Sequence, residues 1–334
     1  MLGGKVLLEV EDLKQWFPIK KGVFNKTVNH VKAVDGISFT IHEGETVSVV
    51  GESGCGKSTA GRSILRLLEP TSGKIMFDGI DLASLSNKEM RAKRKDIQVI
   101  FQDPYASLNP RQTVFQILDE AMKIQGVGEN GNRRERIKDL LLTVGLQPHQ
   151  IDLYPHQFSG GQRQRIGIAR ALSVKPKLII CDEAVSALDV SIQAQVLNLL
   201  KDLQQKYNLT YLFISHDLGV VRHISDRIIV MYLGRIMEIS EKEALFANPG
   251  HPYTRALLSS IPSTNIDVQK DRIILTGDVP SPIDPPSGCP FHTRCPMAKD
   301  ICATQTPVHH QLGDGTNIED VSYCHFVEDG KLVV

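Results

Sequence analysis

The chain has 334 residues, enough for two domains, and its 38 basic residues balance 38 acidic ones. Without a net basic field, the composition suggests no nucleic-acid partner. No stretch approaches the roughly 18 apolar residues of a membrane-spanning helix. The N-terminal residues also lack the apolar region of a signal peptide. We therefore expect a cytosolic chain that reaches a membrane only through a partner.

A phosphate-binding loop follows the first predicted core strand. Residues 45–50 are rich in β-branched side chains and precede Gly51, which predicts a buried strand. The pattern G-x-x-x-x-G-K-S comes next, and an apolar-periodic helix follows it. Lys57 would reach the β- and γ-phosphates, and Ser58 would bind Mg²⁺. The predicted nucleotide contacts of this loop are Gly51, Glu52, Ser53, Gly54, Cys55, Gly56, Lys57, Ser58 and Thr59.

Helical periodicity replaces the strand pattern between Gln102 and Ser159. Apolar residues recur at helical spacing in residues 114–118 and 137–141. Two Asx-Pro steps mark the start of this segment. The sequence predicts a helical insert of about residues 103–158 inside an α/β core.

A second glycine-rich motif opens the helix after this insert. It consists of Ser159, Gly160, Gly161 and Gln162. With a full phosphate loop already present, the motif has no evident role within its own chain. We interpret it as a second phosphate contact, offered to a nucleotide that another copy or a partner holds.

Two carboxylates end a third segment. Asp182 and Glu183 follow the apolar residues 178–181, which are typical of a parallel strand buried on both faces. The carboxyl ends of such strands carry the chemistry of α/β sheets. We expect Asp182 to hold Mg²⁺, directly or through water, and Glu183 to activate the attacking water as general base.

Together these motifs resemble the ATP-binding-cassette (ABC) family of ATPases. Residues 158–165 resemble its signature, and Gln102 resembles the Q-loop glutamine. Residues 186–189 resemble the D-loop, and His216 resembles the switch histidine. The resemblance covers about residues 1–240. It implies an α/β P-loop NTPase with a RecA-like core, an antiparallel β-subdomain and a helical subdomain, acting as a sandwich dimer.

The resemblance also implies roles for individual residues. Gln102 would touch Mg²⁺ or water, since its amide both accepts and donates. His216 would contact the γ-phosphate and align the attacking water. Asp189 would belong to the nucleotide site of the dimer. The adenine would stack on an aromatic side chain near the N-terminus. The sequence offers Trp16 and Phe17, and the register favours Phe17.

Four of the six cysteines gather near the C-terminus, with the spacing C-x5-C-x6-C-x21-C. In a cytosolic chain a metal is a more natural explanation than disulfides. The spacing lacks the close cysteine pair of structural zinc sites, and it differs from the bacterial ferredoxin pattern. An iron–sulfur cluster, zinc and free thiols all stay open. The histidines available to zinc are His292, His309, His310 and His325.

The C-terminal region has a resemblance of its own. Residues 251–258, 277–282 and 288–295 are similar to the C-terminal extension of oligopeptide/dipeptide importer ATPases. Residues 101–111 resemble the same branch. This resemblance implies that residues 241–334 form a small Cys-rich domain. It also implies a 4Fe–4S cluster bound by Cys289, Cys295, Cys302 and Cys324.

The two resemblances imply the ATP-hydrolysing subunit of a bacterial importer for di- and oligopeptides, specifically the second, F-type ATPase of a pair. Its partners would be a paralogous ATPase, two membrane permease subunits and an extracytoplasmic peptide-binding protein. It would lie at the cytoplasmic face of the membrane. Alternatives are an importer of nickel or glutathione, or a non-transport ABC ATPase.

Overall fold

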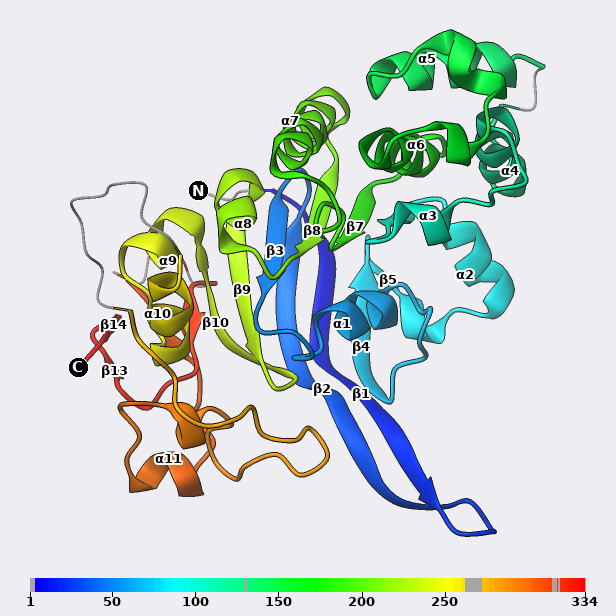
Figure 1. The fold of residues 1–334 in the computed structure, drawn as a ribbon. Coiled ribbons are helices and arrows are strands. Elements are labelled where there is room, and N and C mark those ends of the chain that lie inside the picture. Colours follow the sequence, from blue (N-terminus) through cyan, green and yellow to red (C-terminus); the bar gives the residue numbers. More distant parts are fainter. Residues whose placement is uncertain (1–3, 129–130, 262–271, 314–316, 318, 334) are drawn as a thin grey trace. The chain divides into compact units, whose positions relative to one another are not determined.

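The computed structural model describes residues 4–128, 131–261, 272–313, 317 and 319–333 (Figure 1). The chain divides into two compact units. Unit 1 draws on residues 1–42, 46–83 and 215–334, and unit 2 on residues 43–45 and 84–214. Across the described residues, no helix combines the length and apolarity needed to cross a bilayer.

Unit 1 contains an antiparallel sheet with the strand order β2-β1-β4-β5. Its long hairpin joins β1 (Val6–Lys21) to the edge strand β2 (Lys26–His42), as Figure 1 shows in blue. Strands β4 (Ser72–Phe77) and β5 (Ile80–Asp81) extend the sheet from β1. Alternate residues of β1 enter the core, which explains the strand pattern. The antiparallel β-subdomain expected from the sequence is therefore present.

A second run of strands in unit 1 carries the phosphate loop. Strand β3 (Thr46–Val50) is wholly buried and pairs in parallel with β9 (Arg227–Tyr232). Strand β10 (Arg235–Glu241) returns antiparallel to β9. The helices of this part of the unit are α1 (Lys57–Ile64), α8 (Leu218–Ile224), α9 (Lys242–Ala247) and α10 (Pro252–Ser259).

The described residues after 241 belong to unit 1. Strand β12 (Val321–Ser322) pairs with β10 and with β11 (His310–Gln311), so the extension continues the sheet. An aromatic cluster of Tyr232, Tyr253 and Phe291 fastens the extension to β9. The remaining elements are the 3₁₀ turn His292–Arg294, α11 (Asp300–Thr304), β13 (Val327–Glu328) and β14 (Lys331–Leu332).

Unit 2 contains three parallel strands, β6 (Ile97–Ile100), β7 (Leu178–Asp182) and β8 (Thr210–Ile214). Every residue of β7 and β8 is buried, as their uninterrupted apolar sequences predict. Helices α6 (Gly160–Leu172) and α7 (Val190–Tyr207) flank β7 in the chain. The strands predicted from the sequence therefore form, within a residue of their expected ends.

The segment between β6 and α6 is helical, as expected for the insert. It contains α3 (Pro104–Ser107), α4 (Val114–Ile124), α5 (Arg133–Thr143) and the 3₁₀ turns Pro148–Asp152 and Pro155–Gln157. Helix α2 (Asn87–Lys93) precedes β6. Helix α4 begins with a capping box, in which Thr113 and Gln116 satisfy each other's backbone N–H groups.

Candidate functional site

The phosphate loop in unit 1 depends on glycine at a position of close backbone approach. Gly56 has a φ of +103°, and a Cβ atom there would lie 2.0 Å from the carbonyl oxygen of Ala33 in β2. Only glycine avoids both the strain and the clash. The N–H of Gly234 donates to the carbonyl of Cys55 at 2.9 Å. The loop is thus seated between β2 and the turn that joins β9 to β10.

Lys57, the first residue of α1, closes the phosphate loop. Its ammonium donates to the carbonyl oxygens of Gly51 at 2.8 Å and Glu52 at 2.9 Å. The side chain is 5 % exposed, so the cation is held inside the loop rather than in solvent. The Cys55 thiol near Lys57 is also buried, and this burial raises its pKa. The positive charge of Lys57 partly opposes that rise. Lys57 therefore already faces the space enclosed by the loop, where phosphate oxygens would be bound.

His216 is held near the carboxyl end of β3, where the phosphate loop begins. The N–H of Ser215 donates to the carbonyl of Val49 at 3.1 Å. Asp217 caps α8 by accepting from the N–H of Gly219 at 2.7 Å. The residues on both sides of His216 are therefore fixed, while its own side chain is exposed.

The two candidate adenine platforms differ in their surroundings. The indole N–H of Trp16 donates to Asp35 at 3.1 Å, and the Lys32 ammonium lies 5.2 Å from the ring centroid. Phe17 is 36 % exposed and pairs across the hairpin with Val31, two residues from Ala33. Ala33 is the residue that Gly56 approaches. Phe17 thus offers an exposed ring on the strand pair that seats the phosphate loop.

In unit 2, Gln102 and Glu183 come together. Each follows the carboxyl end of one of two neighbouring parallel strands, β6 and β7. The Gln102 amide donates to the Glu183 carboxylate at 2.8 Å and lies 3.4 Å from the Ser186 hydroxyl. Glu183 adopts a left-handed φ of +51°, which costs free energy in a residue with a Cβ and is common at functional sites. Its N–H donates to the carbonyl of Ile214 at 3.0 Å, which holds this conformation.

The other predicted residues at this edge of the sheet, Asp182 and Asp189, lie close to Glu183 in the chain. Asp182 ends β7 and is 5 % exposed. Its neighbour Cys181 is fully buried, and this burial raises the pKa of the thiol, as expected for a packing residue. Asp189 precedes α7, and its carbonyl accepts from the N–H of Ile192 at 2.9 Å. The Asp189 side chain is exposed.

The signature motif has a structural role within its own chain, which the sequence analysis did not predict. Ser159 caps α6, because its hydroxyl accepts from the N–H of Gln162 at 3.4 Å. The Gln162 amide oxygen in turn accepts from the N–H of Ser159 at 3.0 Å, completing a capping box. The sequence interpretation missed this box because it treated the four residues only as a phosphate-binding pattern.

Glycine in the signature is also required by packing. A Cβ atom at Gly161 would lie 2.5 Å from Cγ2 of Ile192 in α7. The start of α6 therefore lies directly against the start of α7. Three residues further on in α6, the Arg163 guanidinium lies 3.6 Å from the ring centroid of Tyr105 in α3. Through Tyr105, the segment after Gln102 is packed against the signature helix.

The four C-terminal cysteines lie close enough to influence one another electrostatically. Burial raises the pKa of the Cys289 thiol to about 12 and that of Cys324 to about 11, and the other thiols of the group add to both increases. The N–H of Cys289 donates to the carbonyl of Cys302 at 2.8 Å. Cys295 is half-buried. Within the described part of the chain, however, no three His, Cys, Asp or Glu side chains are arranged to hold a metal ion.

The histidines considered as zinc ligands have other contacts. The ring of His292 bonds the carbonyl of Cys289 at 2.8 Å, and that of His325 bonds the carbonyl of Gln305 at 3.0 Å. His309 packs edge-on against the ring of Tyr323. His310 lies in β11. Three of these four histidines therefore contact a backbone carbonyl or an aromatic ring.

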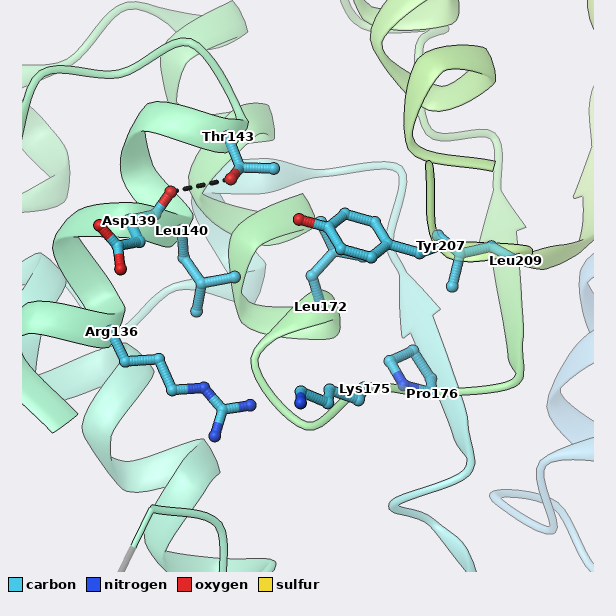
Figure 2. Close-up of a pocket in the computed structure, with 9 residues that line it drawn as sticks. All are labelled: Arg136, Asp139, Leu140, Thr143, Leu172, Lys175, Pro176, Tyr207 and Leu209. Carbon is cyan, nitrogen blue, oxygen red and sulfur yellow. Dashed lines mark hydrogen bonds between the residues drawn. The ribbon is translucent and has the colours of Figure 1, made fainter. Parts of the chain in front are cut away.

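Unit 2 also contains a cavity of about 410 Å³. Figure 2 shows the charged side chains of Arg136 and Lys175 and the ring of Tyr207 among the residues that line the cavity. Its lining residues come from α5, from the end of α6 and the segment after it, and from the end of α7 and the segment after it. None of them belongs to a nucleotide motif.

Comparison with known proteins decides the family. Residues 34–186 match the ABC transporter family, and residues 237–302 match the C-terminal region of oligopeptide/dipeptide transporters. The oligopeptide transport ATP-binding protein AppF of Bacillus subtilis is 58% identical over 306 residues, which cover 91% of this chain and 93% of AppF. The chain belongs to the ATP-binding proteins of oligopeptide/dipeptide ABC transporters.

Other members of this family give the same picture. The oligopeptide transport ATP-binding protein OppF of Escherichia coli K12 is 54% identical over 311 residues, covering 92% of this chain and 93% of OppF. Among solved structures, the ATP-binding cassette MJ0796 bound to ADP and Pi superposes with a TM-score of 0.63 at 29% identity, covering 71% of this chain and 99% of that one. The ABC ATPase fold expected from the sequence is confirmed.

The structure also reveals residues near the phosphate loop that the sequence did not indicate. Arg294, from the loop between two of the cysteines, forms an ion pair with Glu52 at 2.8 Å. The Tyr253 hydroxyl accepts from the N–H of Glu52 at 3.0 Å. These residues lie some 200 or more positions from Glu52 in the chain, and no local pattern could connect them. The only available signal was that Arg294 lies within the family-like segment 288–295.

Proposed function

We propose that this chain is the ATP-hydrolysing subunit of a bacterial ABC importer that takes up di- and oligopeptides. The observation that carries the proposal is the contact between Gln102 and Glu183 at the ends of adjacent parallel strands. A polarising carboxylate beside a glutamine amide suits activation of a water for phosphoryl transfer. The choice of peptides rests on relatives such as AppF and OppF, which are named oligopeptide transport proteins.

In this proposal, the nucleotide is bound mainly by unit 1. The amides of residues 51–59 and the Lys57 ammonium hold the phosphates, because the ammonium already points into the loop. Phe17 stacks on the adenine, and its exposed ring supports this choice over Trp16. His216 contacts the γ-phosphate and aligns the attacking water. Its exposed side chain beyond β3 suits that role.

Unit 2 supplies the groups for hydrolysis and for the partner's nucleotide. Glu183 takes a proton from the attacking water. Asp182 and Gln102 of unit 2 offer oxygen ligands of the kind that Mg²⁺ prefers, as does Ser58 of unit 1, and a bound Mg²⁺ would neutralise phosphate charge. Ser159, Gly160, Gly161 and Gln162 face the nucleotide of the opposite ATPase, with Asp189 beside that interface. Helix geometry supports this role, because the first N–H groups of α6 lack intrahelical acceptors.

The assembly we propose contains a paralogous ATPase, two permease subunits and an extracytoplasmic peptide-binding protein. The chain would sit at the cytoplasmic face of the membrane and be held there by the permeases. Residues 1–240 would form the nucleotide-binding module, and residues 241–334 a Cys-rich extension that continues its sheet through β12.

We further propose that Cys289, Cys295, Cys302 and Cys324 hold a 4Fe–4S cluster. Four thiols that influence one another, three of them buried, make a donor set suited to iron–sulfur chemistry. The donors would have to shift into ligand geometry and lose their protons when the cluster binds. A bound cluster would fix the relative positions of residues 288–302 and 324. Zinc on the same thiols is the alternative.

Reconstitution tests the transport proposal directly. The chain would be co-expressed with the permease subunits and paralogous ATPase encoded beside it, purified as a complex and placed in liposomes with the binding protein. We expect ATP-dependent uptake of a labelled oligopeptide, lost when Lys57→Ala replaces the wild type. Uptake of nickel or glutathione instead would overturn the peptide assignment. Purification with ribosomes or DNA, and not with permeases, would overturn transport.

A further inference from the structure

The C-terminal extension contacts the phosphate loop through one charged pair. Arg294 donates to the Glu52 carboxylate with 2.8 Å between Nη1 and Oε2. The Arg294 side chain is 10% exposed and that of Glu52 27%, so the pair is mostly shielded from solvent. A shielded pair with this geometry is stronger than an ordinary surface ion pair. The second residue of the phosphate loop is thereby tied to residue 294.

The surroundings of Arg294 fix it in place. Its guanidinium lies 5.9 Å from the ring centroid of Tyr232, within the range of a cation–π contact. Tyr232 packs edge-on against Tyr253 and Phe291. Tyr253 then accepts a hydrogen bond from the backbone N–H of Glu52. The extension therefore holds Glu52 by its side chain and by its backbone.

Backbone hydrogen bonds in the segment from Cys289 to Cys295 define the turn that carries Arg294. The N–H of Arg294 donates to the carbonyl of Phe291 at 3.0 Å, and that of Cys295 donates to the carbonyl of His292 at 3.3 Å. The position of the guanidinium thus follows from the path of the chain from Cys289 to Cys295.

Glu52 presents an electrostatic difficulty for a phosphate loop. A carboxylate beside bound phosphates repels them, since like charges a few ångströms apart interact unfavourably in a partly shielded site. An arginine paired with that carboxylate cancels its charge and leaves Lys57 to act on the phosphates. Arg294 is the residue placed to do this, although it is distant in the sequence.

We propose that Arg294 is a positioning residue of the nucleotide site, which neutralises and orients Glu52 so that the phosphate loop can accept MgATP. This inference rests on the proposed function of the loop. It makes the C-terminal extension part of the nucleotide site, in addition to any metal that the cysteines hold.

The test is a cycle of charge-neutral variants, measured as MgATP affinity. The full-length protein is titrated with a fluorescent ATP analogue in a Glu183→Gln background, which limits turnover. We expect Arg294→Gln to weaken binding by about five- to tenfold at low salt. Adding Glu52→Gln should restore affinity to within about twofold of the parent, because the unpaired charge is then gone. Higher salt should reduce the defect of Arg294→Gln.

Arg272 provides the matched control. It lines the same hollow of about 400 Å³ as Arg294 and Glu52, while the ion pair with Glu52 belongs to Arg294. Arg272→Gln makes the same charge change nearby and should alter affinity by less than about twofold. Arg294→Lys keeps the charge and should bind nearly as well as the parent, which covers the case in which Arg294→Gln does not fold.

The outcomes separate the two proposals. Unchanged affinity in Arg294→Gln, or failure of Glu52→Gln to restore a lost affinity, would overturn the role of Arg294 while leaving the ATPase assignment intact. Equal losses of MgATP affinity in Arg272→Gln and Arg294→Gln would show that any nearby positive charge has this effect. That result would also overturn the inference. If the parent protein, which carries only Glu183→Gln, does not bind MgATP, the proposed function itself is contradicted.

Discussion

The Gln102 amide donates a hydrogen bond to the Glu183 carboxylate, with 2.8 Å between Nε2 and Oε2. The two residues are 81 positions apart in the chain, yet they follow neighbouring strands of one parallel sheet. Tyr105, just beyond Gln102, also packs under Arg163 of the signature helix. A shift of the segment from Gln102 to Tyr105 would therefore change contacts both of the proposed base, Glu183, and of the signature helix α6. Such a coupling suits a transport ATPase.

The first prediction concerns Glu183. Glu183→Gln keeps the size of the side chain and its contact with Gln102 but cannot accept a proton from water. We expect ATP hydrolysis to fall by about 10²- to 10⁴-fold, while MgATP affinity changes little. Phosphate release and nucleotide titration measure the two effects separately. Turnover within threefold of wild type would contradict the assignment of Glu183 as base.

The second prediction separates the two roles of Ser159. Ser159→Ala removes the N-cap of α6 and should lower the free energy of unfolding by about 1 kcal/mol. Ser159→Asp keeps an acceptor at the N-cap, so its stability should lie within about 0.5 kcal/mol of wild type. Its carboxylate would nonetheless repel the partner's γ-phosphate, so ATP-dependent dimer closure should be lost.

In the Glu183→Gln background, urea unfolding would measure the stability, and analytical ultracentrifugation with ATP and the paralogous ATPase would measure dimer closure. If Ser159→Asp closed the dimer as well as the serine does, the motif would serve only as a helix cap. The proposed contact with the partner's nucleotide would then be wrong.

The third prediction concerns the C-terminal cysteines. Protein purified without oxygen should contain about four iron and four sulfide per chain, the content of the proposed cluster. Cys324→Ser should lose most of this iron, whereas Cys55→Ala, outside the group, should keep it. Elemental analysis and the visible absorption spectrum measure both. One zinc per chain with no iron would replace the cluster with a structural zinc site.

The fourth prediction concerns Glu238, a fully buried residue of β10. Burial raises the pKa of its carboxyl group to about 7, and neighbouring Asp320 adds to the rise. The folded protein then holds a proton that the unfolded chain releases near its ordinary pKa of 4.5. Stability from this group is therefore present at low pH and is lost as pH rises through about 7.

Glu238→Gln removes that titration. The free energy of unfolding of the variant, relative to wild type, should increase by about 2 kcal/mol between pH 5 and pH 8. Urea unfolding at both pH values measures the change. The difference isolates Glu238 from His251, whose buried imidazole has a lowered pKa of about 3 and acts in the opposite direction. Parallel pH profiles for the two proteins would contradict the prediction.

The sequence by itself determined the elements and most of the chemistry. The apolar runs 178–181 and 211–214 predicted the strands β7 and β8, because burial on both faces leaves no room for alternation. The β-branched residues before Gly51 predicted β3. The phosphate loop could also be predicted from the sequence, since its glycine spacing and Lys57 belong to one local backbone conformation. The cysteine spacing left an iron–sulfur cluster, zinc and free thiols open.

Only the tertiary structure decided how distant residues meet. The ion pair of Arg294 with Glu52 spans 242 positions, and sequence spacing carries no information about side chains that far apart. The capping box of Ser159 and Gln162 is local and could have been predicted from the sequence. It was not predicted because the four residues were considered only as a phosphate-binding motif. Local patterns arise from hydrogen bonds and burial within a few residues, whereas the charge balance of the phosphate loop depends on where the C-terminal extension folds back.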